Sequence, residues 1–149
     1  VKVNGVVFMH GGASQEVAAL GCNGINDGVR RDLAGPAPLP EQLLTMLSSS
    51  ENGPLWYRGL AEEKEETFLP TFETILKALD ARAIVIGHTP VLPGHIATRF
   101  GGRVIEIDTG MLDGEFYPKG VASALEWQGD MVTAIYEDRR ERLSLPAVQ

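Results

Sequence analysis

Two of the three histidines in the chain follow short apolar runs and stand beside glycine. Residues 6–12 (VVFMHGG) place His10 after one run, and residues 84–90 (IVIGHTP) place His88 after the other. An apolar run that stops abruptly is typical of a buried strand, and glycine allows a sharp turn with room for close approach. The pattern predicts a metal-dependent hydrolase with His10 and His88 as metal ligands, because a strand fixes an imidazole while the loop leaves coordination positions open. The alternative is two buried histidines that hydrogen-bond to backbone carbonyls.

Two further side chains could act beside such a metal. Arg58 lies in an aromatic and basic loop, residues 53–59 (GPLWYRG), and a planar guanidinium matches two phosphate oxygens. The alternative for Arg58 is a surface arginine stacked on Trp56 or Tyr57. Asp108 ends an apolar run, where it could orient a histidine or cap the local turn, and both interpretations stay open.

The elements that position these residues can be predicted from hydrophobic periodicity and from turn residues. Residues 11–40 are rich in Gly, Asn, Asp and Pro, and this composition predicts a loop with one short helix at 14–20. Apolar residues at helical spacing predict an amphipathic helix from residue 71 to about 81, with Pro70 at its start and an acidic, solvated segment at 62–66 before it. The remaining predicted elements are a helix at 40–47, a strand at 1–9 interrupted near 4–5, strands at 83–86, 103–108, 121–127 and 131–136, and a hairpin turn at 128–130.

Length and composition predict a single layered α+β domain. The chain has 149 residues, 44% of them hydrophobic and 22% charged, which is enough for one substantial core. We place this domain at residues 1–138 and a charged tail at 139–149. No apolar run approaches the roughly 20 residues that cross a bilayer, so no membrane partner is expected. The net charge of −7 disfavours nucleic acid as a partner, and a single cysteine leaves the compartment open, with the cytoplasm slightly favoured.

The motifs MHGG at 9–12 and IGHTP at 86–90 resemble the last two histidine motifs of the calcineurin-like metallophosphoesterases. The similar branch contains the serine/threonine phosphoprotein phosphatases and their bacterial relatives. Residues 53–58 (GPLWYR) resemble the loop of that branch that supplies a phosphate-gripping arginine. Residues 103–111 (RVIEIDTGM) resemble the strand and loop that follow the second histidine in bacterial members.

This resemblance implies half of a metallophosphoesterase-type β-sandwich flanked by helices, and a site with two divalent metal ions. His10 and His88 would both bind the second ion, Arg58 would grip the phosphate, and a hydroxide bridging the ions would attack phosphorus in line. Neutral imidazole suits Mn, Fe or Zn. The implied reaction is hydrolysis of a phosphomonoester, on a phosphoprotein or on a small phosphorylated compound. A dinucleotide hydrolase or a phosphodiesterase is the alternative within this class.

The chain departs from the family because the earlier motifs, GDxHG, GDxxDRG and GNHE, are absent. Those motifs would supply the other metal ligands and the proton-donating histidine, and two histidines fall short of the usual three or four ligands. The chain also starts with Val1 rather than Met. We therefore expect the C-terminal half of a phosphatase, inactive alone, that needs an N-terminal half with the remaining ligands. The competing interpretation is a non-catalytic binding or assembly module. His95 is expected to be a surface histidine.

Overall fold

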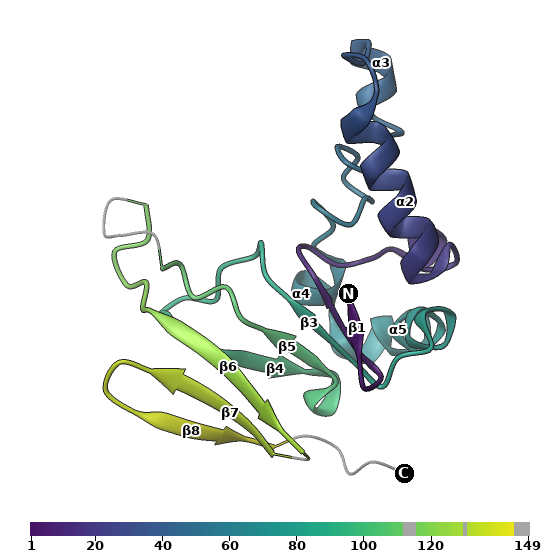
Figure 1. Cartoon of the computed structure of the whole chain (residues 1–149). Coiled ribbons are helices and arrows are strands. Elements are labelled where there is room, and N and C mark those ends of the chain that lie inside the picture. Colours follow the sequence, from purple (N-terminus) through teal and green to yellow (C-terminus); the bar gives the residue numbers. More distant parts are fainter. Residues whose placement is uncertain (112–115, 130, 145–149) are drawn as a thin grey trace.

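The computed structural model describes residues 1–111, 116–129 and 131–144, and it contains two β-sheets and a set of helices (Figure 1). The larger sheet has five strands in the order β1-β2-β3-β5-β4. Its central strands β2, β3 and β5 are parallel, and the edge strands β1 and β4 are antiparallel to their neighbours. The strand bounds are β1 (Lys2–Val3), β2 (Val6–Met9), β3 (Ala83–Ile86), β4 (Ala97–Arg99) and β5 (Val104–Glu106).

The smaller sheet is an antiparallel meander of β6 (Ser123–Gln128), β7 (Met131–Tyr136) and β8 (Arg140–Leu143). The helices are α1 (Gln15–Ala18), α2 (Gly21–Ala34), α3 (Pro40–Leu43), α4 (Gly59–Glu62) and α5 (Glu65–Leu79), with a 3-10 turn η1 (Phe100–Gly102) after β4. Helices α2 and α3 extend away from the sheets (Figure 1). Among the described residues, no helix combines the length and the apolar character that a bilayer-spanning segment requires.

The five-stranded sheet buries both of its faces, as the parallel pairing requires. Alternate side chains of β3 show this, because Ile84 and Ile86 join the helices in one apolar cluster while Val85 faces the smaller sheet in another. On the smaller sheet, Val132 and Ala134 close this second cluster. The predicted layered α+β fold is confirmed, with helices on one face of the large sheet and the small sheet on the other.

Several predicted elements are confirmed. The strands predicted at 83–86 and 131–136 match β3 and β7, and the interruption near 4–5 is a tight turn between β1 and β2. Strands β5 and β6 differ from their predicted bounds by up to two residues at each end. Residues 123–128 and 131–136 pair as the predicted hairpin, whose turn residue Asp130 lies outside the described residues.

The loop predicted at residues 21–34 is wrong, and the helix predicted at 71–81 is confirmed but starts earlier. Residues 21–34 form the long helix α2 instead of a loop, because Ile25 packs in the core and Gly28 lets Leu47 lie against the helix, where a Cβ atom would overlap it. Helix α5 begins at Glu65 rather than at residue 71, so Pro70 lies inside it. The first turn of α5 is held by tertiary contacts, because the Glu65 carboxylate accepts a hydrogen bond from the Phe100 backbone N–H at 2.7 Å. The acidic segment at 62–66 is therefore partly structural rather than only a solvated face.

The helix predicted at 40–47 is shorter than expected, since α3 ends at Leu43. Part of the predicted tail is a strand, because residues 140–143 form β8 at the edge of the small sheet. A short, charged edge strand pairs through its backbone and needs little apolar burial, and Leu143 alone packs against the core. Residues 145–149 of that predicted tail lie outside the described part of the chain.

Candidate functional site

The two predicted histidines meet at the carboxyl end of the parallel strands. His10 directly follows β2 and His88 lies two residues after β3, and these strands pair side by side. The Gly87 backbone N–H donates to the His10 carbonyl at 2.8 Å, which joins the two strand ends. His10 Nε2 lies 3.1 Å from His88 Nδ1, and the ring centroids are 4.9 Å apart. The predicted convergence of the imidazoles is therefore present in the structure.

The His88 imidazole lies in a constrained and partly buried position. Its backbone has a φ of 64°, in the left-handed region that a residue with a side chain rarely adopts. Its Nε2 atom is buried and has no hydrogen-bond partner among the described residues. Burial lowers the pKa of His88, the positive charges of Arg58 and His10 lower it further, and Asp108 opposes them. These effects favour the neutral imidazole, which is the form that binds metals.

The spacing of the two nitrogens fits a shared metal ion. Two nitrogens bound to one ion at about 2.1 Å, with an angle of about 90–110° between them, lie about 3.0–3.4 Å apart. The observed 3.1 Å falls in this range, although it also suits a hydrogen bond between the rings. No group of three or more His, Cys, Asp or Glu side chains that could hold a metal occurs in the described part of the chain. The pair therefore fits two positions around an ion and leaves the other positions to further groups.

The loop that carries Arg58 is attached to both histidine turns. On one side, the Pro54 carbonyl accepts hydrogen bonds from the Gly11 and Gly12 N–H groups at 2.9 and 3.4 Å. Position 11 favours glycine, since a Cβ atom there would lie 3.0 Å from the Tyr57 carbonyl oxygen, a tight contact with backbone. On the other side, Arg58 Nη1 donates to the His88 carbonyl at 3.1 Å. The loop therefore holds the guanidinium next to the imidazole pair.

Arg58 also donates from Nη1 to Thr89 Oγ1 at 2.9 Å. The alternative interpretation, a guanidinium stacked on Trp56 or Tyr57, is not seen among the cation–π contacts of the described residues. Trp56 instead packs its ring edge-on against His88, with centroids 5.4 Å apart.

Asp108 lies near His88 but serves the local turn. Its Oδ1 accepts a hydrogen bond from the Gly110 N–H at 3.0 Å, as the turn-capping interpretation expects. Its charge nevertheless acts on the site, because it raises the pKa of His88 against the other effects. The role of Asp108 in orienting a histidine stays a prediction. His95 is exposed, as expected for a surface histidine.

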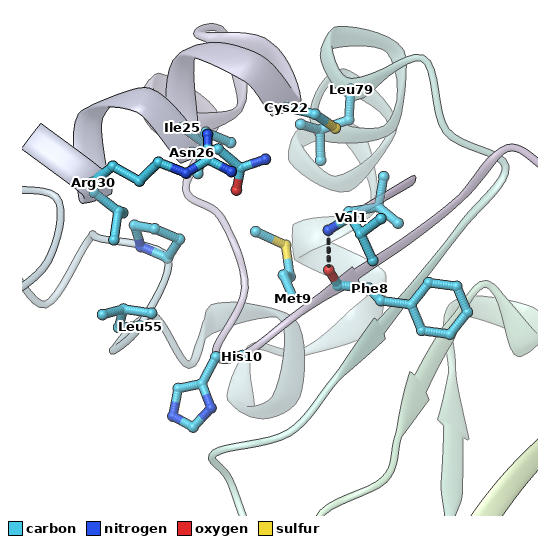
Figure 2. A pocket seen from close by; sticks show the side chains of 13 residues that line it. Val1, Phe8, Met9, His10, Cys22, Ile25, Asn26, Arg30, Leu55 and Leu79 are labelled. Atoms are coloured by element: carbon cyan, nitrogen blue, oxygen red, sulfur yellow. Dashed lines mark hydrogen bonds between the residues drawn. The ribbon is translucent and has the colours of Figure 1, made fainter. Parts of the chain in front are cut away.

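A cavity of about 190 Å³ lies on the α2 side of His10 (Figure 2). Its walls are mostly apolar, with Met9 and Leu55 near His10, and Asn26 and Arg30 reach it from α2. The His10 ring points away from Met9 and from the α2 side chains (Figure 2). The sequence did not predict that Asn26 and Arg30 line this cavity because it did not predict α2. Thr89 was missed as well, although it directly follows His88 in the motif IGHTP.

Comparison with known proteins finds phosphatases among those similar to this chain. The chain is 31% identical over 145 residues to an uncharacterized protein of Schizosaccharomyces pombe, and the match covers 95% of the chain and 43% of that protein. It is 29% identical over 115 residues to Shewanella-like protein phosphatase 1 of Plasmodium berghei, over 74% of the chain and 32% of the relative. No family model matches the chain.

The solved structures of a cold-active protein tyrosine phosphatase from a Shewanella species share the fold. One superposes with a TM-score of 0.74 at 25% identity and covers 97% of the chain, and a point mutant of that enzyme gives the same TM-score at 26% identity. The chain is phosphatase-like. It spans 41% of the length of the first of these phosphatase chains and no more than 43% of the relatives matched by sequence.

Proposed function

We propose that this phosphatase-like chain provides part of a metal-dependent phosphoester hydrolase site of the calcineurin-like type. His10 and His88 would hold one divalent cation, and Arg58 would bind the phosphate. The observation that carries this proposal is the meeting of three groups: two imidazole nitrogens 3.1 Å apart, and a guanidinium that is hydrogen-bonded to the carbonyl of one of those histidines. The phosphatases to which the chain is similar support the reaction class.

Each residue has a distinct role in this proposal. The strand ends hold the imidazoles, and the His88 turn directs one nitrogen toward the place where the ion would lie. Arg58 uses Nη1 to attach to the protein, which leaves its Nε–Nη2 edge without a partner among the described residues and available for two phosphoryl oxygens. A divalent cation bound by the histidines would act as a Lewis acid on a phosphoryl oxygen.

Among the described residues, the proposed site has fewer ligands than a metal ion needs. Two imidazoles are fewer than the three or four ligands that a protein usually supplies, and the family-type reaction uses two ions of Mn, Fe or Zn. We propose that the remaining ligands and the second ion belong to polypeptide outside these 149 residues. Its matched relatives are more than twice as long, and this supports the proposal. The proposed substrates are phosphomonoesters, including phosphorylated protein side chains.

Manganese binding tests this proposal on the chain itself. Mn²⁺ added in small amounts broadens the NMR signals of nearby protons, so we expect the ring signals of His10 and His88 to disappear together. The exposed His95 is the matched control, and its signal should persist until much higher Mn²⁺. In His10→Ala the ring signals of His88 should no longer broaden, and in His88→Ala those of His10 should no longer broaden. His95→Ala should leave the broadening of the His10 and His88 signals unchanged. Equal broadening of all three histidines would contradict the proposal.

A phosphatase assay then separates the competing functions. With Mn²⁺ and an aryl phosphate, the chain alone should show little turnover although it binds the ion. Turnover comparable to that of an intact phosphatase would contradict the incomplete site. A well-folded chain that binds no ion at the histidine pair would favour the non-catalytic module.

A further inference from the structure

The residue after His88 lies in an unusual turn. The Thr89 backbone N–H donates to the Gly87 carbonyl at 2.7 Å, and the residue between them, His88, has a φ of 64°. A hydrogen bond from the N–H of one residue to the carbonyl two residues earlier, with a positive φ at the residue between them, defines the rare classic γ-turn. A backbone strained in this way persists only where the surrounding structure holds it, and such positions cluster at functional sites.

The turn presents two acceptors to a single arginine nitrogen. Arg58 Nη1 donates to the His88 carbonyl at 3.1 Å and to Thr89 Oγ1 at 2.9 Å. A guanidinium Nη atom carries two hydrogens, both in the plane of the group. One acceptor would let the guanidinium rotate about that bond, whereas two acceptors on the same nitrogen fix the plane. The Thr89 hydroxyl is therefore the contact that sets the orientation of the Arg58 fork.

We infer that Thr89 is a positioning residue: its hydroxyl holds the Arg58 guanidinium in the plane in which its Nε–Nη2 edge can receive a phosphate beside the histidine pair. Only the binding of phosphate by Arg58 rests on the proposed function. The orientation of Arg58 by Thr89 is a property of the protein before any ligand binds.

The γ-turn links this arrangement to the metal-binding pair. The same turn places the His88 ring next to His10 and places the His88 carbonyl and the Thr89 hydroxyl next to Arg58. Threonine suits the position because its branched Cβ restricts χ1, so the hydroxyl has few alternative directions. Serine keeps the hydroxyl with more freedom, and valine keeps the shape without it.

The test measures the order of the Arg58 side chain in Thr89→Val and Thr89→Ser. The Nε–H signal of Arg58 is assigned as the one that disappears in Arg58→Lys, and its ¹⁵N heteronuclear NOE reports motion on the picosecond to nanosecond scale. The NOE should be high in the wild type, fall in Thr89→Val and be largely restored in Thr89→Ser. Thr98→Val, at an exposed position on β4, is the matched control and should leave it unchanged.

A titration with inorganic phosphate then measures the consequence. Loss of the hydrogen bond from Arg58 to the Thr89 hydroxyl should weaken phosphate binding about fivefold to tenfold in Thr89→Val. Thr89→Ser should recover most of the phosphate affinity. An unchanged Arg58 NOE in Thr89→Val overturns the positioning role, whatever phosphate does. A lowered NOE with no phosphate response in the wild type instead supports the positioning role and contradicts the proposed function of Arg58.

Discussion

Gly11→Ala should strain the attachment of the Arg58 loop to the His10 turn. A Cβ atom at position 11 would lie 3.0 Å from the Tyr57 carbonyl oxygen and 3.2 Å from the Pro54 carbonyl oxygen, closer than ordinary contact. Both atoms are backbone, so the loop must yield by a few tenths of an ångström, and we expect the 2.9 Å hydrogen bond from Gly11 N to Pro54 O to lengthen. Overpacking of this kind costs about 1–3 kcal/mol. For a chain of this size we therefore expect the melting temperature to fall by about 4–8 °C, at about 2–4 °C per kcal/mol and a cost near 2 kcal/mol.

Gly87→Ala is the matched control, because it adds the same methyl group to the other histidine turn. There a Cβ atom would lie 3.5 Å from the His10 carbonyl oxygen, an ordinary contact. We expect Gly87→Ala to change stability by less than about 1 kcal/mol. Thermal unfolding followed by circular dichroism measures both variants, and the Arg58 Nε–H signal reports whether the loop has moved. If the two variants melt alike and the Arg58 signal stays in place, the close approach at Gly11 does not hold the loop.

Three further perturbations test other parts of the account. Arg58→Lys keeps the charge but loses the planar fork, so phosphate binding should weaken by about tenfold while Mn²⁺ binding stays unchanged, as titrations with each probe would show. Arg99 donates to the Leu60 carbonyl at 2.6 Å and to the Glu63 carbonyl, and these bonds hold α4, which begins directly after Arg58. Arg99→Met should therefore lower the free energy of unfolding by about 2 kcal/mol, as denaturant unfolding would measure, and should make the Arg58 side chain more mobile. Burial raises the pKa of the Glu106 carboxyl group, and the positive charge of Arg99 offsets part of this rise. The Glu106 carboxyl group therefore binds a proton more tightly in the folded state than in the unfolded state. The stability that protonated Glu106 contributes is fully present below the pKa of an unfolded glutamate and is lost as the pH rises through the raised pKa of the folded state. Glu106→Gln should remove this fall when the melting temperature is measured over about pH 4–8.

The convergence of the two histidines could be predicted because it depends on local pattern and on a general rule of sheets. Both histidines follow apolar runs, and parallel neighbouring strands end at the same edge, so His10 and His88 meet once β2 and β3 pair. The apolar face of α5 was readable for the same reason, since its buried residues Phe72, Ile75 and Leu79 recur at helical spacing.

The parts that sequence reasoning missed depend on contacts between distant segments. The glycines and asparagines of α2 are poor helix formers, and the helix is supported by Ile25 in the core and by Leu47 against Gly28. Strand β8 is nearly all charged, and only its backbone pairing with β7 reveals it. The role of Thr89 depends on a guanidinium 31 residues away in the chain, which no local pattern indicates.

A double-mutant cycle on Zn²⁺ affinity tests the shared cation most directly. Calorimetric titration of the wild type, His10→Ala, His88→Ala and the double variant gives the coupling between the two imidazoles. If both bind one ion, either single substitution should remove most of the measurable affinity, and the double variant should lose little more. Losses that simply add, or a loss of the same size in His95→Ala, would show that the two histidines do not share an ion.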